Sequence, residues 1–246
     1  MPAAVKYTKA GKIYSRSHLG KVFRTKGLED FTLEIPKGEL FGLLGLNGAG
    51  KTTAMKLLLG LLFPTSGGVE IMGLPAGTDE VKRKIGYLPE LPYFYPWLTP
   101  GESLEFYGRL SGAAPRTVKT RVPEIIKLVG LDPHKNKKLG EFSKGMLQRV
   151  GLAQALVHDP DIIVLDEPVS GLDPLAIWDF RELFTELNRA GKTIFLSSHS
   201  ISEVEKICHR VGIMSGGKLV RLLGQDEWRG QSGGLEVIFV EAVKGK

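Results

Sequence analysis

The sequence has one cysteine, no long hydrophobic run and no sustained heptad repeat, and each of these features excludes a class of protein. Cys208 is the single cysteine among 246 residues, so an internal disulfide and a cysteine-based metal site are both excluded. Its apolar neighbours recur at helical spacing, which favours a packed core thiol over a nucleophile. The stretch from Gly50 to Phe142 shows no heptads, which argues against an inserted coiled coil.

Hydrophobic residues are not gathered into segments that would cross a membrane. A transmembrane helix needs about 18 or more apolar residues in succession, whereas the longest candidate, Met55 to Phe63, is shorter and contains Lys56 and Gly60. The N-terminus carries scattered lysines and lacks the apolar centre of a signal peptide. We therefore expect the protein to stay in the cytoplasm unless something recruits it.

The overall composition is that of an ordinary globular protein. Hydrophobic residues make up 42% of the chain and charged residues 24%, and the length suits one large domain or two modest ones. The net charge of +6 would suit nucleic acid, anionic lipid or a nucleotide. Because the basic residues are spread along the chain, charge alone does not choose among these ligands.

A glycine-rich segment carries the clearest chemical signal. Residues 45 to 52 read GLNGAGKT, which matches the phosphate-loop pattern G-x-x-x-x-G-K-[ST] directly after the apolar run Leu40 to Leu44. In such a loop the backbone N–H groups and the following helix surround an anion. Lys51 would contact the β and γ phosphates and Thr52 would hold Mg²⁺; the alternative is a plain glycine-rich turn. The predicted ATP-binding residues here are Asn47, Gly48, Ala49, Gly50, Lys51, Thr52 and Thr53.

The pattern of apolar residues predicts an α/β fold. Period-two alternation favours strands at Val5 to Tyr7 and Phe31 to Ile35. Two strongly apolar segments, 162 to 165 and 193 to 196, flank a helical stretch from 176 to 189, as in a parallel sheet buried on both faces. Further helices are predicted at residues 53–62, 101–110, 117–129 and 144–157.

These elements predict a P-loop nucleotide-binding core with a mostly parallel sheet, an N-terminal antiparallel β subdomain and a helical insertion subdomain. The expected division places the catalytic core at residues 1–89 and 158–223, and the helical subdomain at 90–157. Residues 224–246 form a C-terminal accessory segment, in which Leu235 to Val240 is predicted to be a strand.

Two adjacent carboxylates follow the first strongly apolar strand. Asp166 and Glu167 emerge at the strand's carboxyl end, which is the edge where open α/β sheets bind ligands. Asp166 would hold Mg²⁺ through water, and Glu167 would polarise a water that attacks the γ-phosphate. A helix-capping Asp-Glu pair is the alternative. His199 ends the next apolar strand at the same edge, whereas the other histidines are taken as structural.

A third segment is ambiguous by itself. Ser143 has the position of an N-cap, and Val150, Ala153 and Leu156 repeat at helical spacing after it. Alone, this pattern indicates only a capped amphipathic helix. The serine and glycine at the helix start would nevertheless suit an anion.

Taken in order, the motifs GLNGAGKTT, FSKGM followed by LQR, IIVLDEP, SGLD and SSH resemble the nucleotide-binding subunit of an ATP-binding-cassette (ABC) transporter. The resemblance extends from about Lys12 to about Leu223. It implies that two copies sandwich two ATP molecules, and that Ser143, Lys144 and Gly145 of one copy face the phosphate loop of the other. It further implies that Asp173 lies at the dimer junction and that His199 contacts the γ-phosphate. The cofactors implied are ATP and Mg²⁺.

The same resemblance implies that an aromatic side chain stacks on adenine. Tyr14 is the best candidate, and Tyr7 and Phe23 are rivals because Ser15 to Lys26 resembles a local insertion. The chain also departs from the family pattern. Glu90 replaces a glutamine near the Mg²⁺ site, and an ionised carboxylate cannot donate a hydrogen bond. Lys144 and Met146 replace the commoner glycine and glutamine, and these variants resemble exporters whose membrane subunit is encoded separately.

Four aromatic residues within five positions follow Glu90, in the segment YFYPW at 93 to 97. They would form either an internal plug or an exposed groove for a partner helix. By resemblance this segment adjoins the membrane subunit, so the groove is favoured and the permease is expected to bind through residues 90–110.

The function that follows is an ATPase that drives transport as a homodimer of cassettes, with no nucleic-acid partner expected. The alternatives are a cassette ATPase acting on nucleic acid, in translation or DNA repair, and a small-molecule P-loop kinase. Salt-sensitive binding to RNA or DNA would indicate the first alternative. Turnover that depends on a phosphate acceptor would indicate the second.

Overall fold

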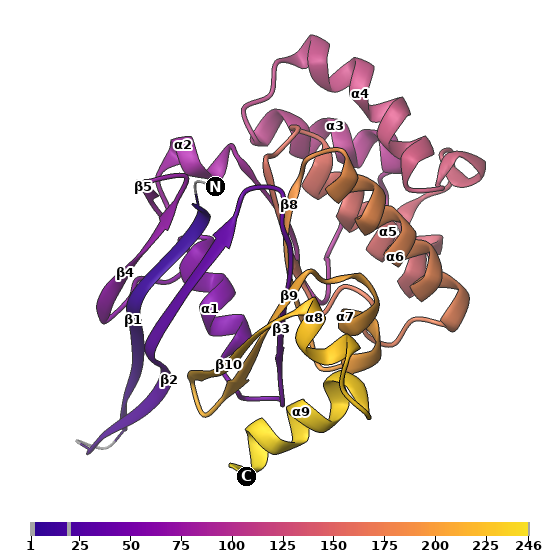
Figure 1. Cartoon of the computed structure of the whole chain (residues 1–246). Coiled ribbons are helices and arrows are strands. Elements are labelled where there is room, and N and C mark those ends of the chain that lie inside the picture. Colours follow the sequence, from indigo (N-terminus) through magenta and orange to yellow (C-terminus); the bar gives the residue numbers. More distant parts are fainter. Residues whose placement is uncertain (1–2, 19–20, 246) are drawn as a thin grey trace. The chain divides into compact units, whose positions relative to one another are not determined.

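The computed structural model describes residues 3–18 and 21–245 (Figure 1). The chain forms two compact units. The first contains the residues up to Val81 together with those from Phe195 onward, and the second contains Lys82 to Ile194. The chain passes between them within α2 (Asp79–Lys82) and within β8 (Thr193–Ser198). The sequence-based division into core, helical subdomain and C-terminal segment was drawn by expected function and not by compactness. It stays a prediction.

An antiparallel sheet forms one layer of the first unit. Its strands lie in the order β2 (Lys21–Pro36), β1 (Ala3–His18), β4 (Ser66–Ile71) and β5 (Leu74–Pro75). Both predicted N-terminal strands are confirmed within β1 and β2. From Leu28 to Ile35 buried and exposed residues alternate along much of β2, whereas residues 21 to 26 are exposed on both faces. The segment expected to be an insertion is therefore the outer part of a long β-hairpin.

The first unit also contains a group of paired strands, one of which leads into the phosphate loop. Strand β3 (Leu40–Gly45) is entirely buried and pairs in parallel with β9 (Arg210–Ser215), which pairs antiparallel with β10 (Lys218–Gly224). The Arg210 guanidinium binds the Glu39 carboxylate at 2.7 Å beside this pairing. The helices that lie wholly within this unit are α1 (Lys51–Leu58), α7 (Ile201–Ile207), α8 (Gln225–Arg229) and α9 (Gly234–Lys244).

The strand predicted at Leu235 to Val240 is wrong, because these residues lie in α9. The buried residues Leu235, Ile238 and Phe239 have the i, i+3, i+4 spacing of a helix face. A window of six mostly branched apolar residues does not distinguish a strand from one face of a helix. Gly233, with a φ of 87°, turns the chain immediately before the helix.

The second unit combines helices with the parallel pair β6 (Ile85–Leu88) and β7 (Ile162–Asp166). The four helices predicted in this region are confirmed to within two residues at each end. Two short 3₁₀ turns, at Asp132–His134 and Leu139–Glu141, connect them. The helices are α3 (Pro100–Leu110), α4 (Pro115–Leu128), α5 (Lys144–Leu156) and α6 (Pro174–Arg189).

Helix α5 packs closely against β6 because two glycines remove side chains from the contact. A Cβ atom at Gly86 would collide with the carbonyl of Ala155, and one at Gly151 would collide with the side chain of Leu88. Such close approach fixes the second half of α5 against β6. Among the helices that the structure describes, none is long and apolar enough to span a membrane.

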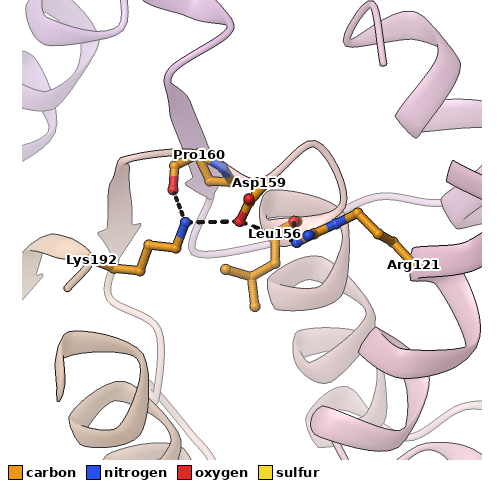
Figure 2. Close-up of polar contacts among 5 residues, drawn as sticks. All are labelled: Arg121, Leu156, Asp159, Pro160 and Lys192. Carbon is orange, nitrogen blue, oxygen red and sulfur yellow. Dashed lines mark hydrogen bonds and ion pairs between the residues drawn. The ribbon is translucent and has the colours of Figure 1, made fainter. Parts of the chain in front are cut away.

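A polar cluster joins three elements of the second unit (Figure 2). The Asp159 carboxylate accepts hydrogen bonds from Lys192 at 2.8 Å and from Arg121 at 3.2 Å. Lys192 also donates to the carbonyl of Pro160, and Arg121 to that of Leu156. The hydrogen bond from Lys192 is the main reason that the pKa of Asp159 is lowered. The cluster therefore ties α4 to the chain between α5 and β7 and to the segment before β8.

We predict that Asp159→Asn destabilises the protein at neutral pH by about 1 kcal/mol, since the amide cannot form the ion pairs. Asn tolerates the left-handed backbone at this position, where φ is 59°. Because the folded-state pKa is lowered, the stabilisation is present above the unfolded pKa of about 3.9 and is lost as pH falls. The variant and the wild type should therefore converge in acid, as measured by urea unfolding at several pH values.

Asp132→Asn is the matched control, because both aspartate side chains are 58% exposed and, in the described part of the chain, Asp132 forms a single ion pair, with Lys135. The control should change the free energy of unfolding by less than about 0.5 kcal/mol. Equal effects of the two substitutions at neutral pH would show that the cluster has no special role.

Candidate functional site

The phosphate loop connects β3 to α1 in the first unit, and its shape depends on glycine. Gly48 and Gly50 have φ values of 81° and 109°, which side-chain-bearing residues rarely adopt. A Cβ atom on Gly50 would also lie 2.7 Å from the carbonyl oxygen of Gly27. No side chain caps the start of α1, and the N-terminus of a helix favours an anion.

Lys51 is buried, and its ammonium donates a hydrogen bond to the carbonyl of Gly45 at 2.7 Å. This contact holds the positive charge at the end of β3, next to the loop. The loop is held from its other side by backbone bonds. Gly217, in the turn between β9 and β10, donates to the carbonyl of Ala49 at 3.0 Å and accepts from Glu29 of β2 at 2.9 Å. The arrangement is that of a rigid phosphate cradle.

The structure brings Tyr14 to the start of α1. Its hydroxyl lies 3.2 Å from the Thr53 hydroxyl, and its ring lies so close to Gly27 that a Cβ there would approach it to 2.5 Å. Tyr7, by contrast, is fully buried and donates to the carbonyl of Ala54, so neither face of its ring is free for a base. Phe23 lies farther along the hairpin, opposite position 16.

The paired carboxylates lie at the end of β7 in the second unit, as the sequence predicts. Asp166 is its last residue, and Asp166 and Glu167 are both buried. Glu167 has a φ of 49°, a left-handed conformation that costs a non-glycine residue about 1 kcal/mol or more. Burial, with a smaller contribution from the charge of Asp166, raises the pKa of Tyr87 to about 12. Strained backbone of this kind is typical of functional positions.

The start of α5 lies beside the loop that precedes α6. The Ser143 hydroxyl caps α5 by accepting from the N–H of Met146 at 3.3 Å, and Asp173 caps α6 by accepting from Ala176 at 2.9 Å. Lys144 donates to the carbonyl of Ser170 at 2.6 Å. A Cβ at Gly145 would meet only ordinary contact with Leu172, so the fold of the second unit does not itself require glycine there.

Glu90 is exposed just after β6, and a residue that sequence reasoning missed fixes its backbone. Gln148 is completely buried on α5, and its side-chain amide donates to the carbonyl of Glu90 at 3.1 Å. Its position in the sequence could have predicted this role. Residue 148 falls on the buried face of the predicted helix, where a polar side chain needs a hydrogen-bond partner. His199, in the first unit, directly follows β8 and is exposed.

Most of the aromatic segment lies on the surface of the second unit. Phe94 is buried and packs edge-on against Tyr107, so this one residue is an internal plug. We call the exposed residues Tyr93, Tyr95, Trp97 and Phe106 the aromatic surface. The Tyr95 ring lies 5.2 Å from that of Trp97 and 5.9 Å from that of Phe106. Large exposed apolar patches are typical of interaction sites in soluble proteins.

The residues expected to hold Mg²⁺ suit the ion in their chemistry. Within residues 3–18 and 21–245, no group of three or more His, Cys, Asp or Glu residues is gathered as in an all-protein metal site. Magnesium is instead usually bound by one or two protein oxygens together with phosphates and water. Thr52 is exposed at the first turn of α1, and Asp166 supplies a carboxylate.

Comparison of sequences matches residues 28–170 to the ABC transporter family. An uncharacterised ABC transporter ATP-binding protein of Nostoc sp. (strain PCC 7120) is 46% identical over 241 residues, which cover 90% of this chain and 72% of that protein. The bacitracin transport ATP-binding protein BcrA of Enterococcus faecalis is 42% identical over 199 residues, covering 80% of this chain and 64% of BcrA. This chain therefore spans less than two thirds of the length of BcrA.

Solved structures give the same result. The ATP-binding subunit of an ABC transporter superposes with a TM-score of 0.81 at 31% identity, covering 97% of this chain and 99% of that one. A dimeric ATP-binding cassette in a post-hydrolysis state with ADP and phosphate superposes with a TM-score of 0.80 at 27% identity, covering 90% of this chain and 98% of that one. The α/β class predicted from the sequence is confirmed.

We predict that Tyr14→Ala weakens ATP binding about tenfold or more, because stacking of an aromatic ring on a base contributes roughly 1–3 kcal/mol. Tyr14→Phe should retain nearly all of the affinity, since the ring rather than the hydroxyl carries the stacking. Fluorescence titration with an ATP analogue measures both variants, and Phe23→Ala is the control within the same hairpin. A larger loss for Phe23→Ala than for Tyr14→Ala would assign the stacking to Phe23.

Proposed function

Because the chain belongs to the ABC transporter family, we propose that it binds and hydrolyses ATP to drive a transporter whose membrane subunit is a separate protein. The observation that carries the proposal is the phosphate loop, with glycines in left-handed conformations and a buried Lys51 at its strand end. The transport names of its relatives, among them BcrA for bacitracin, support an exporter. The nucleic-acid and kinase alternatives have no representative among the relatives described above.

ATP would bind with its triphosphate in the loop and its adenine on Tyr14. The N–H groups from Asn47 to Thr53 and the ammonium of Lys51 would surround the β and γ phosphates. The hydroxyl of Thr52 and the carboxylate of Asp166 are the proposed magnesium ligands. A bound magnesium ion would neutralise charge on the β and γ phosphate oxygens.

Hydrolysis would depend on Glu167. Its carboxylate would orient a water and accept a proton as the water oxygen bonds to the γ-phosphorus and the bond to the β–γ bridging oxygen breaks. The products are ADP and inorganic phosphate. His199 would donate a hydrogen bond to the γ-phosphate. Glu90 would hold a water or approach the metal, as the carboxylate counterpart of the usual glutamine.

A second cassette would complete each site. Ser143, Lys144 and Gly145 of the second copy would contact the γ-phosphate from the start of their helix, where N–H groups favour an anion. Asp173 would lie at the junction of the two copies. Loss of the γ-phosphate removes these contacts, so hydrolysis would separate the pair.

The membrane subunit would bind the second unit through residues 90–110, which include the aromatic surface. Aromatic residues are favoured at such interfaces because they bury large apolar area. Through this contact the protein would lie at the inner face of the cell membrane. Gln148 connects the same region to α5 through the Glu90 carbonyl. Docking of a partner there would therefore be able to shift the position of α5 and of Ser143 at its start.

We predict that Glu167→Gln retains ATP binding, lowers hydrolysis at least about 100-fold through loss of the general base, and accumulates an ATP-bound dimer. Light scattering after size-exclusion chromatography, with and without ATP, measures the dimer. Glu124→Gln, at an exposed position on α4, is the control and should behave as wild type. A Glu167→Gln variant that remains monomeric and still hydrolyses ATP would refute the mechanism.

We also predict that Tyr95→Glu abolishes co-purification of the membrane subunit from detergent-solubilised membranes, because a charge would be buried at the interface. ATP hydrolysis by the free protein should stay within about twofold of wild type, since surface changes rarely disturb a fold. Leu128→Glu is the matched control, because Tyr95 and Leu128 are 41% and 39% exposed. Unchanged co-purification with Tyr95→Glu would contradict the assignment.

A further inference from the structure

The first unit has a cavity between the phosphate loop and the C-terminal helix. Its volume is about 190 Å³. Leu46 and Asn47 of the loop form one wall, Met214 of β9 and Gly216 of the turn after it form another, and Val243 of α9 closes it. Figure 1 shows α9 beside the end of β3 from which the loop leaves. Drug-sized ligands occupy pockets of roughly 300–1,000 Å³, so this cavity suits an inserted side chain better than a small molecule.

Helix α9 presents apolar residues on both of its faces. Leu235, Ile238 and Phe239 are buried in the unit, whereas Val237 and Val240 are exposed. Val237, Val240 and Val243 follow one another at i, i+3 spacing, so they lie along one side of the helix. We call these three residues the valine face. Leu46, on the phosphate loop, is also exposed, so apolar side chains continue from the valine face across the cavity to the loop.

The parts that frame the cavity are firmly held. Gly217 bonds to the Ala49 carbonyl at 3.0 Å, which fixes the turn after β9 to the phosphate loop. The N–H of Leu235 donates to the Glu205 carboxylate of α7 at 2.9 Å, which fixes the start of α9. The valine face is therefore a preformed surface, and a preformed surface loses little conformational entropy on binding.

We propose that the valine face and the adjoining cavity are part of the surface on which a second copy of this chain docks. The inference rests on the proposed function, in which a second cassette covers the phosphate loop, and it adds α9 to that interface. Two of the cavity's walls belong to the loop and to the turn bonded to it. A copy that approaches the loop would thus meet Val243 and Val240 and remove them from water.

The docking surface is tested in the Glu167→Gln background with ATP. Val243→Glu and Val240→Glu should each raise the ATP concentration needed for half-maximal dimer at least about tenfold, because a charge replaces a buried methyl group. ATP affinity of the monomer, measured at low protein concentration with a fluorescent ATP analogue, should be unchanged. Val220→Glu on β10 is the matched control, since Val220 and Val240 are 40% and 39% exposed.

Thiol labelling gives a second measurement that does not depend on disturbing the surface. The only native thiol, Cys208, is buried, so a cysteine introduced by Val240→Cys is labelled selectively by a maleimide. ATP should slow this labelling at protein concentrations that give dimer and leave it unchanged at concentrations that give monomer. Labelling of Val220→Cys should not respond to ATP at either concentration.

The outcomes distinguish the two proposals. If the Glu167→Gln parent stays monomeric with ATP, the proposed function fails and the docking surface fails with it. If the parent forms dimers while the Val243 and Val240 substitutions leave dimerisation unchanged, only the docking surface is overturned. Slower labelling of Val240→Cys in the ATP-bound monomer would likewise overturn it, because the protection would then arise within one chain.

Discussion

The close approach of three backbone segments at Gly50 sets the geometry of the nucleotide site. A Cβ atom there would lie 2.7 Å from the Gly27 carbonyl and 3.4 Å from Gly217, so β2 and the turn after β9 pack directly on the loop. Tyr14 lies against Gly27 in the same region, and Val243 of α9 lines a cavity together with residues of the loop and of the turn after β9. The proposed adenine, phosphate and docking surfaces therefore adjoin one packed junction of backbone.

The elements that were predictable from the sequence are those in which local pattern and tertiary packing agree. The glycine loop after a buried strand and the Asp-Glu pair after a second one are specified within a few residues, because each follows from an apolar run and its end. Helix α5 of the second unit was recognisable from Ser143 at its N-cap and from Val150, Ala153 and Leu156 at helical spacing. These signals need no information from distant residues.

The remaining features depend on contacts between residues far apart in the sequence. Leu235 to Val240 reads equally well as a strand or a helix face, and burial against α7 and β9 decides for the helix. The choice between Tyr7 and Tyr14 depends on which ring is buried, which the spacing of aromatics does not encode. Gln148 acquires its role only when α5 packs on β6 through Gly86 and Gly151, so that its amide reaches the Glu90 carbonyl.

The departure at Lys144 has a physical consequence for coupling within the second unit. Its ammonium donates to the Ser170 carbonyl at 2.6 Å, a charge-assisted hydrogen bond that a glycine at this position would lack. A phosphate approaching the start of α5 would compete for Lys144 and release Ser170, which lies three residues before Asp173. In the proposed dimer, nucleotide contact at α5 and the position of the Asp173 loop would be coupled through this hydrogen bond, because gaining the phosphate would weaken the hold of Lys144 on Ser170.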